Sequence, residues 1–322
     1  MPSSIEKAVQ RLEQLRQAGI SLDDAERKNI NQSIENIAQP LRKGVDSVDS
    51  IETKDLTVAE TNPISKKINI DLAALAAAGY VTPNSPRTTA TDQFRVIKRP
   101  LLENATGKGA SAILNGNLIM VTSSLPGEGK SFAAINLAMS LAMELNHTVL
   151  LVDADVARPS IMKKLGLQSA PGLLDLLLDE KIELSDVLLK TNVPKLTILP
   201  TGVPHPRATE LLASEAMTSL LKDLARRYSD RIIIFDSPPL LLTTEARVLA
   251  SHMGQIVMIV QAEKTLQSQV QHALSTIENC PVKLIVLNQA RTRGLGAYGY
   301  GYGYGYGYEH KLDSALKSSP TQ

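Results

Sequence analysis

The sequence predicts a doubly wound α/β domain, in which a mainly parallel sheet carries helices on both faces. From Asn117 onward, apolar runs rich in valine and isoleucine alternate with helical stretches. The runs are continuous rather than alternating, which is typical of strands buried on both faces of a parallel sheet. The predicted strands are LIMVTS, TVLLVDAD, LTILP, RIIIFDS, IVMIVQ and VKLIVLN at residues 118–123, 148–155, 196–200, 231–237, 256–261 and 282–288.

Helical stretches separate these strands and should form the outer layers of the domain. The predicted helices cover residues 130–145, 172–180, 208–228 and 266–279. Ligands of such sheets bind at the carboxyl ends of the strands, so functional residues are expected there.

Composition limits the classes of partner. With 34 basic and 33 acidic residues in 322, the formal charge is +1, so no global field recruits nucleic acid, and none is expected as a partner. The single cysteine, Cys280, excludes an internal disulfide and fits a reducing cytoplasm. The start MPSSIEKAVQ lacks the apolar core of a secretory signal, and FAAINLAMSLAMEL is shorter than the roughly 20 residues of a membrane span. We expect a cytoplasmic chain that reaches the inner membrane through a partner.

The N-terminal part differs in pattern from the main domain. Residues 1–20 form a predicted amphipathic helix, because Ser3 and Glu6 have capping-box spacing and apolar residues follow on one face. Residues 21–90 are polar and broken, typical of a mostly flexible linker with a short helix near 70–79 that Gly79 ends. That helix either meets a partner or packs on the main domain. The main domain covers 91–293, and 294–322 form a flexible tail.

The segment SSLPGEGKSF lies between the first predicted strand and the helix that follows it. Gly127 and Gly129 would let backbone amides approach an anion, Lys130 adds a positive charge, and Ser131 offers a hydroxyl to Mg²⁺. The strict phosphate-loop pattern requires glycine where this chain has Ser124. The alternative is a glycine-rich turn that contains Lys-Ser by coincidence.

Acidic residues follow two other buried strands. Asp153 and Asp155 end the second strand, and Asp236 ends the fourth after four apolar residues, at the position of a Walker-B aspartate. Buried carboxylates at one sheet edge are costly unless a cation offsets them. The alternative is that each acid caps a helix. Asn288 ends the last strand and is either a reader of a nucleobase or a turn residue.

The phosphate loop, the D-x-D at 153–155 and the D-S-P-P at 236–239 together resemble the bacterial tyrosine kinases, which share the MinD/ParA nucleotide-binding fold. The likeness extends from about Asp92 to the C-terminus. FRVIKRPLL, DADVARPS and the helical N-terminal region are similar, more narrowly, to the tyrosine autokinases of exopolysaccharide loci associated with the PEP-CTERM/exosortase system.

The resemblance implies transfer of a phosphoryl group from ATP, with Mg²⁺, to protein tyrosine, in the service of exopolysaccharide polymerisation and export. The catalytic residues are then Lys130, Asp153 and Asp155; the metal residues are Ser131, Asp153 and Asp236; and the nucleotide-binding residues are Gly127, Glu128, Gly129, Lys130, Ser131, Phe132 and Asn288. Either Asp153 or Asp155 would accept the proton of the tyrosine. The implied partners are a second copy of the chain, a membrane activator of the chain-length-determinant (Wzz-like) type and a cognate tyrosine phosphatase.

The sequence also departs from the family. The signature lysine of MinD/ParA ATPases would fall at Leu125, and the arginine of D-x-D-x-R is replaced by Ala157, with Arg158 next. The regulatory E-x-x-R-x-x-R helix, linked to self-association, corresponds to DQFRVIKR. Its counterpart residues are Asp92, Arg95 and Lys98. A solvated helix face explains these residues equally well.

Two other functions compete with the kinase. A MinD/ParA-type ATPase switch would share the loop and the acids but phosphorylate no protein. A nucleotide-binding adaptor of a membrane polysaccharide complex would show only nucleotide-dependent binding.

Tyrosine alternates with glycine near the C-terminus, in AYGYGYGYGYGYEHK. Glycine at every second position opposes a strand and favours a mobile tail. Such a tail is either a low-complexity segment or the substrate of the kinase itself. The expected phosphoacceptors are Tyr298, Tyr300, Tyr302, Tyr304, Tyr306 and Tyr308.

Overall fold

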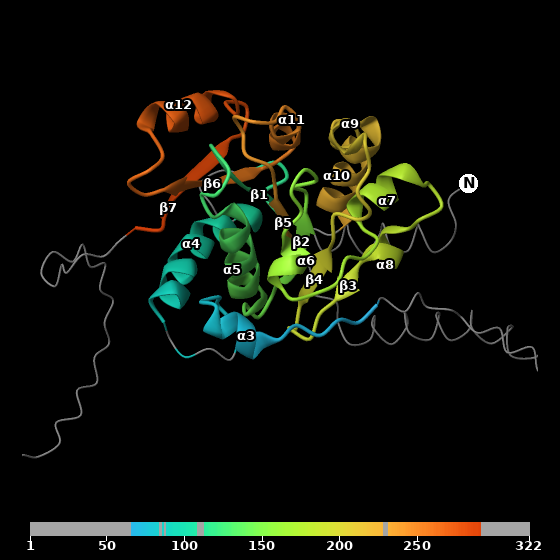
Figure 1. The fold of residues 1–322 in the computed structure, drawn as a ribbon, viewed down its shortest axis with the longest axis horizontal. Helices are drawn as coiled ribbons and strands as arrows, with labels where there is room; N and C mark the ends of the chain where they lie inside the picture. Colours follow the sequence, from blue (N-terminus) through green and yellow to red (C-terminus); the bar gives the residue numbers. More distant parts are fainter. Residues whose placement is uncertain (1–65, 84–85, 87, 108–112, 228–230, 291–322) are drawn as a thin grey trace, which may run out of the picture. The chain divides into compact units, whose positions relative to one another are not determined.

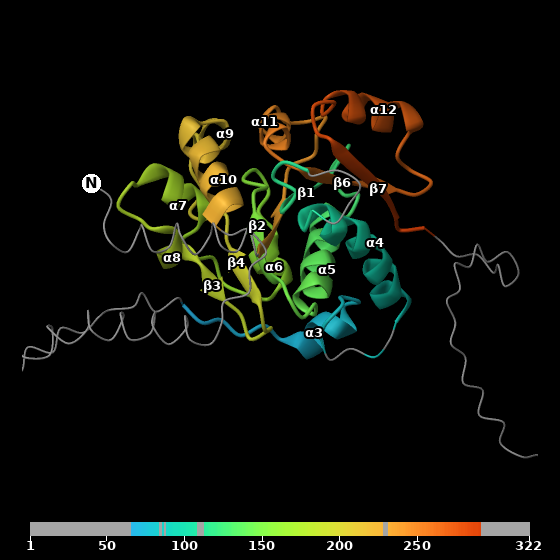
Figure 2. The ribbon, with the colours of Figure 1, turned by 180° about the vertical axis from the view of Figure 1, so that it is seen from behind.

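The computed structural model describes residues 66–83, 86, 88–107, 113–227 and 231–290. In this part of the chain lies a seven-stranded sheet with the order β3-β4-β2-β5-β1-β6-β7 (Figures 1 and 2). The strands are β1 (Leu118–Ser123), β2 (Thr148–Asp153), β3 (Leu189–Lys190), β4 (Leu196–Leu199), β5 (Arg231–Asp236), β6 (Gln255–Gln261) and β7 (Val282–Asn288). Every strand predicted from an apolar run is present, and β3 is a short edge strand that no apolar run marks.

The sheet is parallel except for the pairing of β3 with β4. This confirms the predicted fold class. Strand β2 pairs with β5, and in their register Asp153 lies opposite Asp236. Strand β1 lies on the other side of β5 and leads into the phosphate loop. The register therefore brings the acids of two strands beside the loop at one edge of the sheet.

Ten helices surround the sheet in the described residues, and one predicted helix is divided. They are α3 (Leu72–Ala77), α4 (Thr89–Ala105), α5 (Lys130–Ala142), α6 (Ile161–Lys164), α7 (Leu173–Leu178), α8 (Leu184–Val187), α9 (Ala208–Leu212), α10 (Glu215–Arg227), α11 (Glu245–Ser251) and α12 (Gln267–Ser275). The single helix predicted over 208–228 is wrong. The Ser214 hydroxyl accepts a bond from the Met217 amide (3.2 Å), and this cap starts a second helix.

Hydrophobic clusters cover both faces of the sheet. On one face, buried residues of α7 to α12 pack against Leu118 and Met120 of β1. On the other, buried residues of α3 to α6 pack against Ile119 and Val121 of the same strand. Consecutive strand residues thus enter opposite cores, which explains why the strands are continuous apolar runs.

Residues 66–82 belong to the packed domain, although the sequence assigns them to a segment that is mostly linker. The Ile68 amide donates to the Lys190 carbonyl of β3 (2.8 Å), and the Val81 amide donates to Asn136 of α5 (2.6 Å). Between them, Asp71 caps α3, and Leu75 is buried in the core. Of the two alternatives for the short helix, packing on the main domain is the one observed.

None of the described helices is both long and apolar enough to cross a bilayer. The predicted N-terminal helix at 1–20 and the tyrosine-rich tail lie outside the described residues.

Candidate active site

The phosphate loop connects β1 to α5 and depends on two glycines. Gly127 and Gly129 have φ of +85° and +98°, in the region that favours glycine. At Gly129 a Cβ atom would also clash with Asn288 Nδ2. Ser124 is not among the positive-φ residues of the described chain, so the loop here does not require the glycine of the strict pattern.

Side chains brace this loop from within and from β7. The Glu128 carboxylate, which is buried, accepts a bond from the Leu125 amide (2.7 Å) and another from the Thr265 hydroxyl. The Asn288 amide donates to the Glu128 carbonyl (2.9 Å). Glu128 and Asn288 therefore shape the loop. Thr265 was not predicted, because it lies 137 positions from Glu128 in the sequence.

Lys130 and Asp155 form an ion pair above the loop. Lys130 Nζ lies 2.5 Å from Asp155 Oδ2, and the two side chains are 13% and 3% exposed. Asp155 Oδ1 also accepts a bond from the Arg158 amide (3.1 Å). Both oxygens of Asp155 thus have donors.

Asp153 and Asp236 are buried with oxygens that lack donors. Asp153 Oδ2 accepts bonds from the Ser160 and Ile161 amides (3.1 and 3.0 Å), but its Oδ1 accepts none, and neither oxygen of Asp236 accepts one. Burial raises the pKa of Asp153 to about 6, against the amide bonds that lower it. Burial raises the pKa of Asp236 to about 7, although the charge of Lys130 lowers it.

Ser131 lies in the first turn of α5, beside these acids. Its hydroxyl accepts a bond from the Ser160 hydroxyl (2.9 Å), a residue that the sequence did not single out. The side chain of Phe132 instead contacts the ring of Tyr80, with centroids 4.9 Å apart. Phe132 therefore packs against the segment that follows α3.

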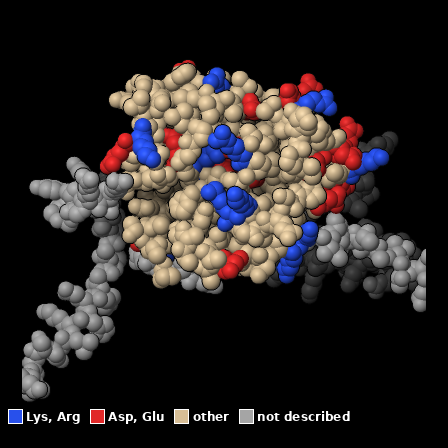
Figure 3. Space-filling view, in the orientation of Figure 1, with Lys and Arg blue, Asp and Glu red and all other residues tan. Residues whose placement is uncertain are grey.

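A pocket opens over the loop, and basic side chains lie near it. Gly127, Lys130 and Asp155 line one part of this pocket, and Pro238 and Pro239 line another. Figure 3 shows basic side chains over α6, near the middle of the face seen in Figure 1. The exposed basic residues at α6 are Arg158, Lys163 and Lys164.

The site accepts a metal only together with other ligands. In the described residues, no three His, Cys, Asp or Glu side chains are grouped so as to hold a metal ion by themselves. However, Asp153 and Asp236 carry three buried oxygens without donors, and such groups suit a cation. A divalent ion would therefore need further oxygen ligands, such as a hydroxyl, water or phosphate.

The three predicted regulatory residues lie on α4 in different surroundings. Asp92 and Arg95 are exposed and 3.4 Å apart. Lys98 is buried, and its Nζ donates to the Ser140 carbonyl and pairs with Glu144, both at 2.7 Å. The description of a solvated face therefore fails for Lys98, which attaches α4 to α5. The predicted phosphoacceptors lie outside the described residues.

Known proteins resemble this chain over the same region. A family model described as an AAA domain matches residues 116–288. The tyrosine-protein kinase YwqD of Bacillus subtilis is 30% identical over 205 residues, which cover 64% of this chain and 82% of YwqD. The tyrosine-protein kinase ptk of Acinetobacter johnsonii is 31% identical over 270 residues, 80% of this chain but 34% of ptk.

A solved structure supports the same grouping. The kinase domain of VpsO is 29% identical with a TM-score of 0.55, and the match covers 63% of this chain and 95% of that domain. The match to YwqD spans most of that protein, and the sheet, the loop and the acids agree with the motifs described above. The chain belongs to the bacterial tyrosine kinases, within the P-loop proteins of the AAA-domain family.

Proposed function

We propose that this chain is an ATP-dependent protein-tyrosine autokinase that phosphorylates the C-terminal tyrosine cluster of a neighbouring copy. The observation that carries the proposal is the group of buried acids beside Lys130 at the end of the phosphate loop. Such an arrangement suits phosphoryl transfer, which requires positioning of the phosphates and compensation of their charge. The tyrosine-kinase relatives supply the class of acceptor.

The loop amides and Lys130 would hold the phosphates of ATP. Ser131 and Asp236 would hold Mg²⁺, with Asp153 adjacent, because the oxygens of Asp236 have no other partner. When bound, Mg²⁺ offsets negative charge on the transferring phosphoryl group.

Contacts favour Asp153 over Asp155 as the base. Both oxygens of Asp155 already accept bonds from Lys130 and from the Arg158 amide. Asp153 keeps one oxygen without a donor. In the proposed step, the tyrosine oxygen bonds to the γ-phosphorus, its proton passes to the Asp153 carboxylate, and the bond to ADP breaks.

The biological setting extends the proposal beyond the described residues. A tail of alternating tyrosine and glycine can enter the site of a neighbour, and each phosphate adds roughly 1.5 to 2 negative charges, which would separate the copies. We further propose a membrane activator of the chain-length-determinant type, which would bring the chain to the inner membrane, and a role in exopolysaccharide polymerisation and export. A cognate phosphatase would reset the tail.

Substitution of Lys130 tests the function. Full-length wild type, Lys130→Met and the surface control Lys222→Met are incubated with Mg²⁺ and γ-labelled ATP. We expect label on tail tyrosines in wild type and control, and at least a hundredfold less in Lys130→Met, the usual loss when a group that stabilises transition-state charge is removed. Equal labelling in Lys130→Met would refute the proposal. Release of all label as free phosphate by wild type would indicate an ATPase switch, and nucleotide binding without turnover would indicate an adaptor.

A further inference from the structure

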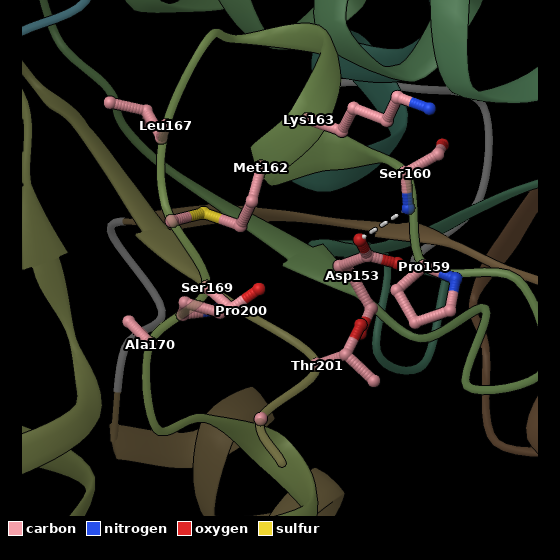
Figure 4. A pocket seen from close by; sticks show the side chains of 11 residues that line it. Asp153, Pro159, Ser160, Met162, Lys163, Leu167, Ser169, Ala170, Pro200 and Thr201 are labelled. Atoms are coloured by element: carbon pink, nitrogen blue, oxygen red, sulfur yellow. Dashed lines mark hydrogen bonds between the residues drawn. The ribbon is translucent and has the colours of Figure 1, made fainter. Parts of the chain in front are cut away.

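The outer edge of β7 is a surface that the proposed transfer does not use. The pocket drawn in Figure 4 belongs to the active site, because Asp153 lines it and accepts the bond from the Ser160 amide there. By contrast, β7 is the last strand of the sheet and pairs with β6 over its whole length (Figures 1 and 2). Within the described part of the chain, no strand pairs with its other edge, which is therefore open.

Every second residue of β7 directs its backbone groups to this open edge. The Asn288 carbonyl accepts a bond from the amide of Ala262, which directly follows β6 (2.9 Å), so the backbone of Asn288 faces β6. Because successive residues of a strand alternate in direction, the amides and carbonyls of Lys283, Ile285 and Leu287 face away from β6. Such a row of backbone groups is a template for another strand.

The side chains at this edge are apolar and exposed. Ile285 is 54% exposed and Leu287 is 61% exposed. In the register with β6, Ile285 lies opposite Met258 and Leu287 lies opposite Val260, both of which are buried. Ile285 and Leu287 therefore continue an apolar face of the sheet beyond the part that the helices cover. An open edge that carries apolar side chains favours pairing with a further strand.

The chain itself supplies a segment with a matching pattern next to this edge. The described residues end at Ala290, and Gln289 has a φ of +58°, a left-handed conformation that ends the extended run. From Tyr298 to Tyr308, tyrosine alternates with glycine, so an extended tail would place its tyrosines on one face. Residues 289–297 lie between, which is longer than the usual hairpin loop of about two to five residues. This length allows the tail to return to β7.

We propose that residues 298–304 pair with the open edge of β7 as an antiparallel strand, the tail strand. Its tyrosines contact Ile285 and Leu287, and its backbone bonds to the outward-facing groups of β7. Alternating glycines oppose an isolated strand, but the edge supplies partners for every second residue, and aromatic side chains beside β-branched ones stabilise the pair. A second copy of β7 would compete for the same edge, but the attached tail has the higher effective concentration.

The tail strand goes beyond the proposed function, because pairing requires no phosphoryl transfer. It also regulates access to the tyrosines, since a tail held on its own β7 is withheld from the active site of a neighbour. A phosphate on a paired tyrosine would bring roughly 1.5 to 2 negative charges beside apolar side chains, which opposes pairing. The edge thus stores the unmodified tail, and modification releases it.

Hydrogen exchange of the full chain without nucleotide tests the tail strand. All chains carry Lys130→Met, so that their tails stay without phosphate. In one variant, Ile285→Thr and Leu287→Thr are combined, because threonine suits a strand but removes the apolar contacts. Its control combines Leu114→Thr and Leu145→Thr, at two exposed leucines elsewhere. A second variant carries serine at the six tail tyrosines, and its control carries phenylalanine there.

Each chain is analysed by mass spectrometry in the segment that its substitutions leave unaltered. In residues 298–308, we expect exchange at least about tenfold faster in the β7 variant than in the parent and the leucine control. In residues 282–288, the outward-facing amides should exchange faster by a similar factor in the serine variant than in the parent and the phenylalanine control. The amides that bond to β6 should be equally slow in the parent, the serine variant and the phenylalanine control.

Equal exchange in the parent and both variants would overturn the tail strand. Slow exchange that is lost on dilution would also overturn it, because a second copy would then cover the edge. Transfer from γ-labelled ATP in chains that keep Lys130 separates this inference from the proposed function. If the tail is slow to exchange but no label reaches tyrosine, the tail strand stands and the kinase proposal fails. If tyrosines are labelled but neither segment is slow to exchange, the kinase proposal stands and the tail strand fails.

Discussion

Replacing Asp236 with asparagine should stabilise the nucleotide-free chain at pH 8. Burial raises the pKa of Asp236 from 3.8 to about 7, so ionisation of this group is unfavourable in the folded state. The unfolded chain ionises freely above about pH 4. The resulting loss of stability is absent below that pH, grows as the pH rises, and reaches its full size above about pH 7.

The magnitude follows from the difference between the two pKa values. About three units correspond to about 4 kcal/mol at pH 8, and the partial loss at pH 5 is about 2 kcal/mol. A buried asparagine leaves its own polar atoms unsatisfied, which costs about 1 to 3 kcal/mol. The net gain should be about 2 kcal/mol at pH 8 and near zero at pH 5. For a domain of this size, that raises Tm by about 4 to 8 °C at pH 8.

Thermal unfolding of full-length variants, monitored by circular dichroism in EDTA without nucleotide, measures this difference. Asp155→Asn is the matched control, because it removes an equally buried carboxylate that has a lysine partner. It should lower stability by about 3 kcal/mol, since Lys130 then loses its counter-charge in a mostly buried position. The two substitutions are chemically identical, but their effects on the free energy of unfolding should have opposite signs.

The reasoning fails if Asp236→Asn is less stable than wild type at pH 8, or if its effect is the same at pH 5 and pH 8. Either result would mean that ionisation of Asp236 does not oppose folding. The Mg²⁺ complex of a non-hydrolysable ATP analogue adds a second readout. It should stabilise wild type more than Asp236→Asn, because only the carboxylate gains a cation.

Two further predictions concern α4 and the loop. In denaturant melts, Lys98→Met should lower the free energy of unfolding by about 1 to 3 kcal/mol, because Glu144 and the Ser140 carbonyl lose a buried donor. Arg95 is exposed, so Arg95→Met should change the free energy of unfolding by less than about 1 kcal/mol. Gly129→Ala should weaken the binding of a fluorescent ATP analogue at least tenfold, because its Cβ meets Asn288. Gly127→Ala should do so less, since no atom lies within 4 Å of its Cβ, and an equal loss in both would contradict the steric argument.

The strands were predictable because burial on both faces leaves a continuous apolar run. Helix boundaries depended on single polar contacts, which the periodicity of apolar residues does not reveal. The Ser214 hydroxyl starts α10 inside a stretch whose apolar spacing is uninterrupted. Residues 66–82 were assigned mainly to the linker because their anchors, β3 and Asn136, lie far away in the sequence.

In the site, the position after a strand predicted the acids but not their partners. Asp153 and Asp155 are equivalent in the sequence, two residues apart at the end of one strand. The strand ends at Asp153, so Asp155 lies beyond it and has different neighbours: Asp155 meets Lys130, and Asp153 meets the amides that begin α6. Ser160 and Thr265 carried no motif, so only the folded chain assigns them to the site.

The same contacts explain why the site opposes folding when it is empty. Among the described residues, Lys130 forms an ion pair with one of the three buried acids, Asp155. Asp236 lies opposite Asp153 in the register of β5 and β2, so the two carboxylates without a lysine partner are also neighbours. The charges of Asp153 and Asp155 raise the pKa of Asp236 further, beyond the effect of burial. A hydrophobic pair at these positions would fold more stably but would give a cation nothing to bind. The unfavourable charges of the empty site are therefore the same groups that would favour binding of a metal and nucleotide, and stability and function should change in opposite directions at Asp236.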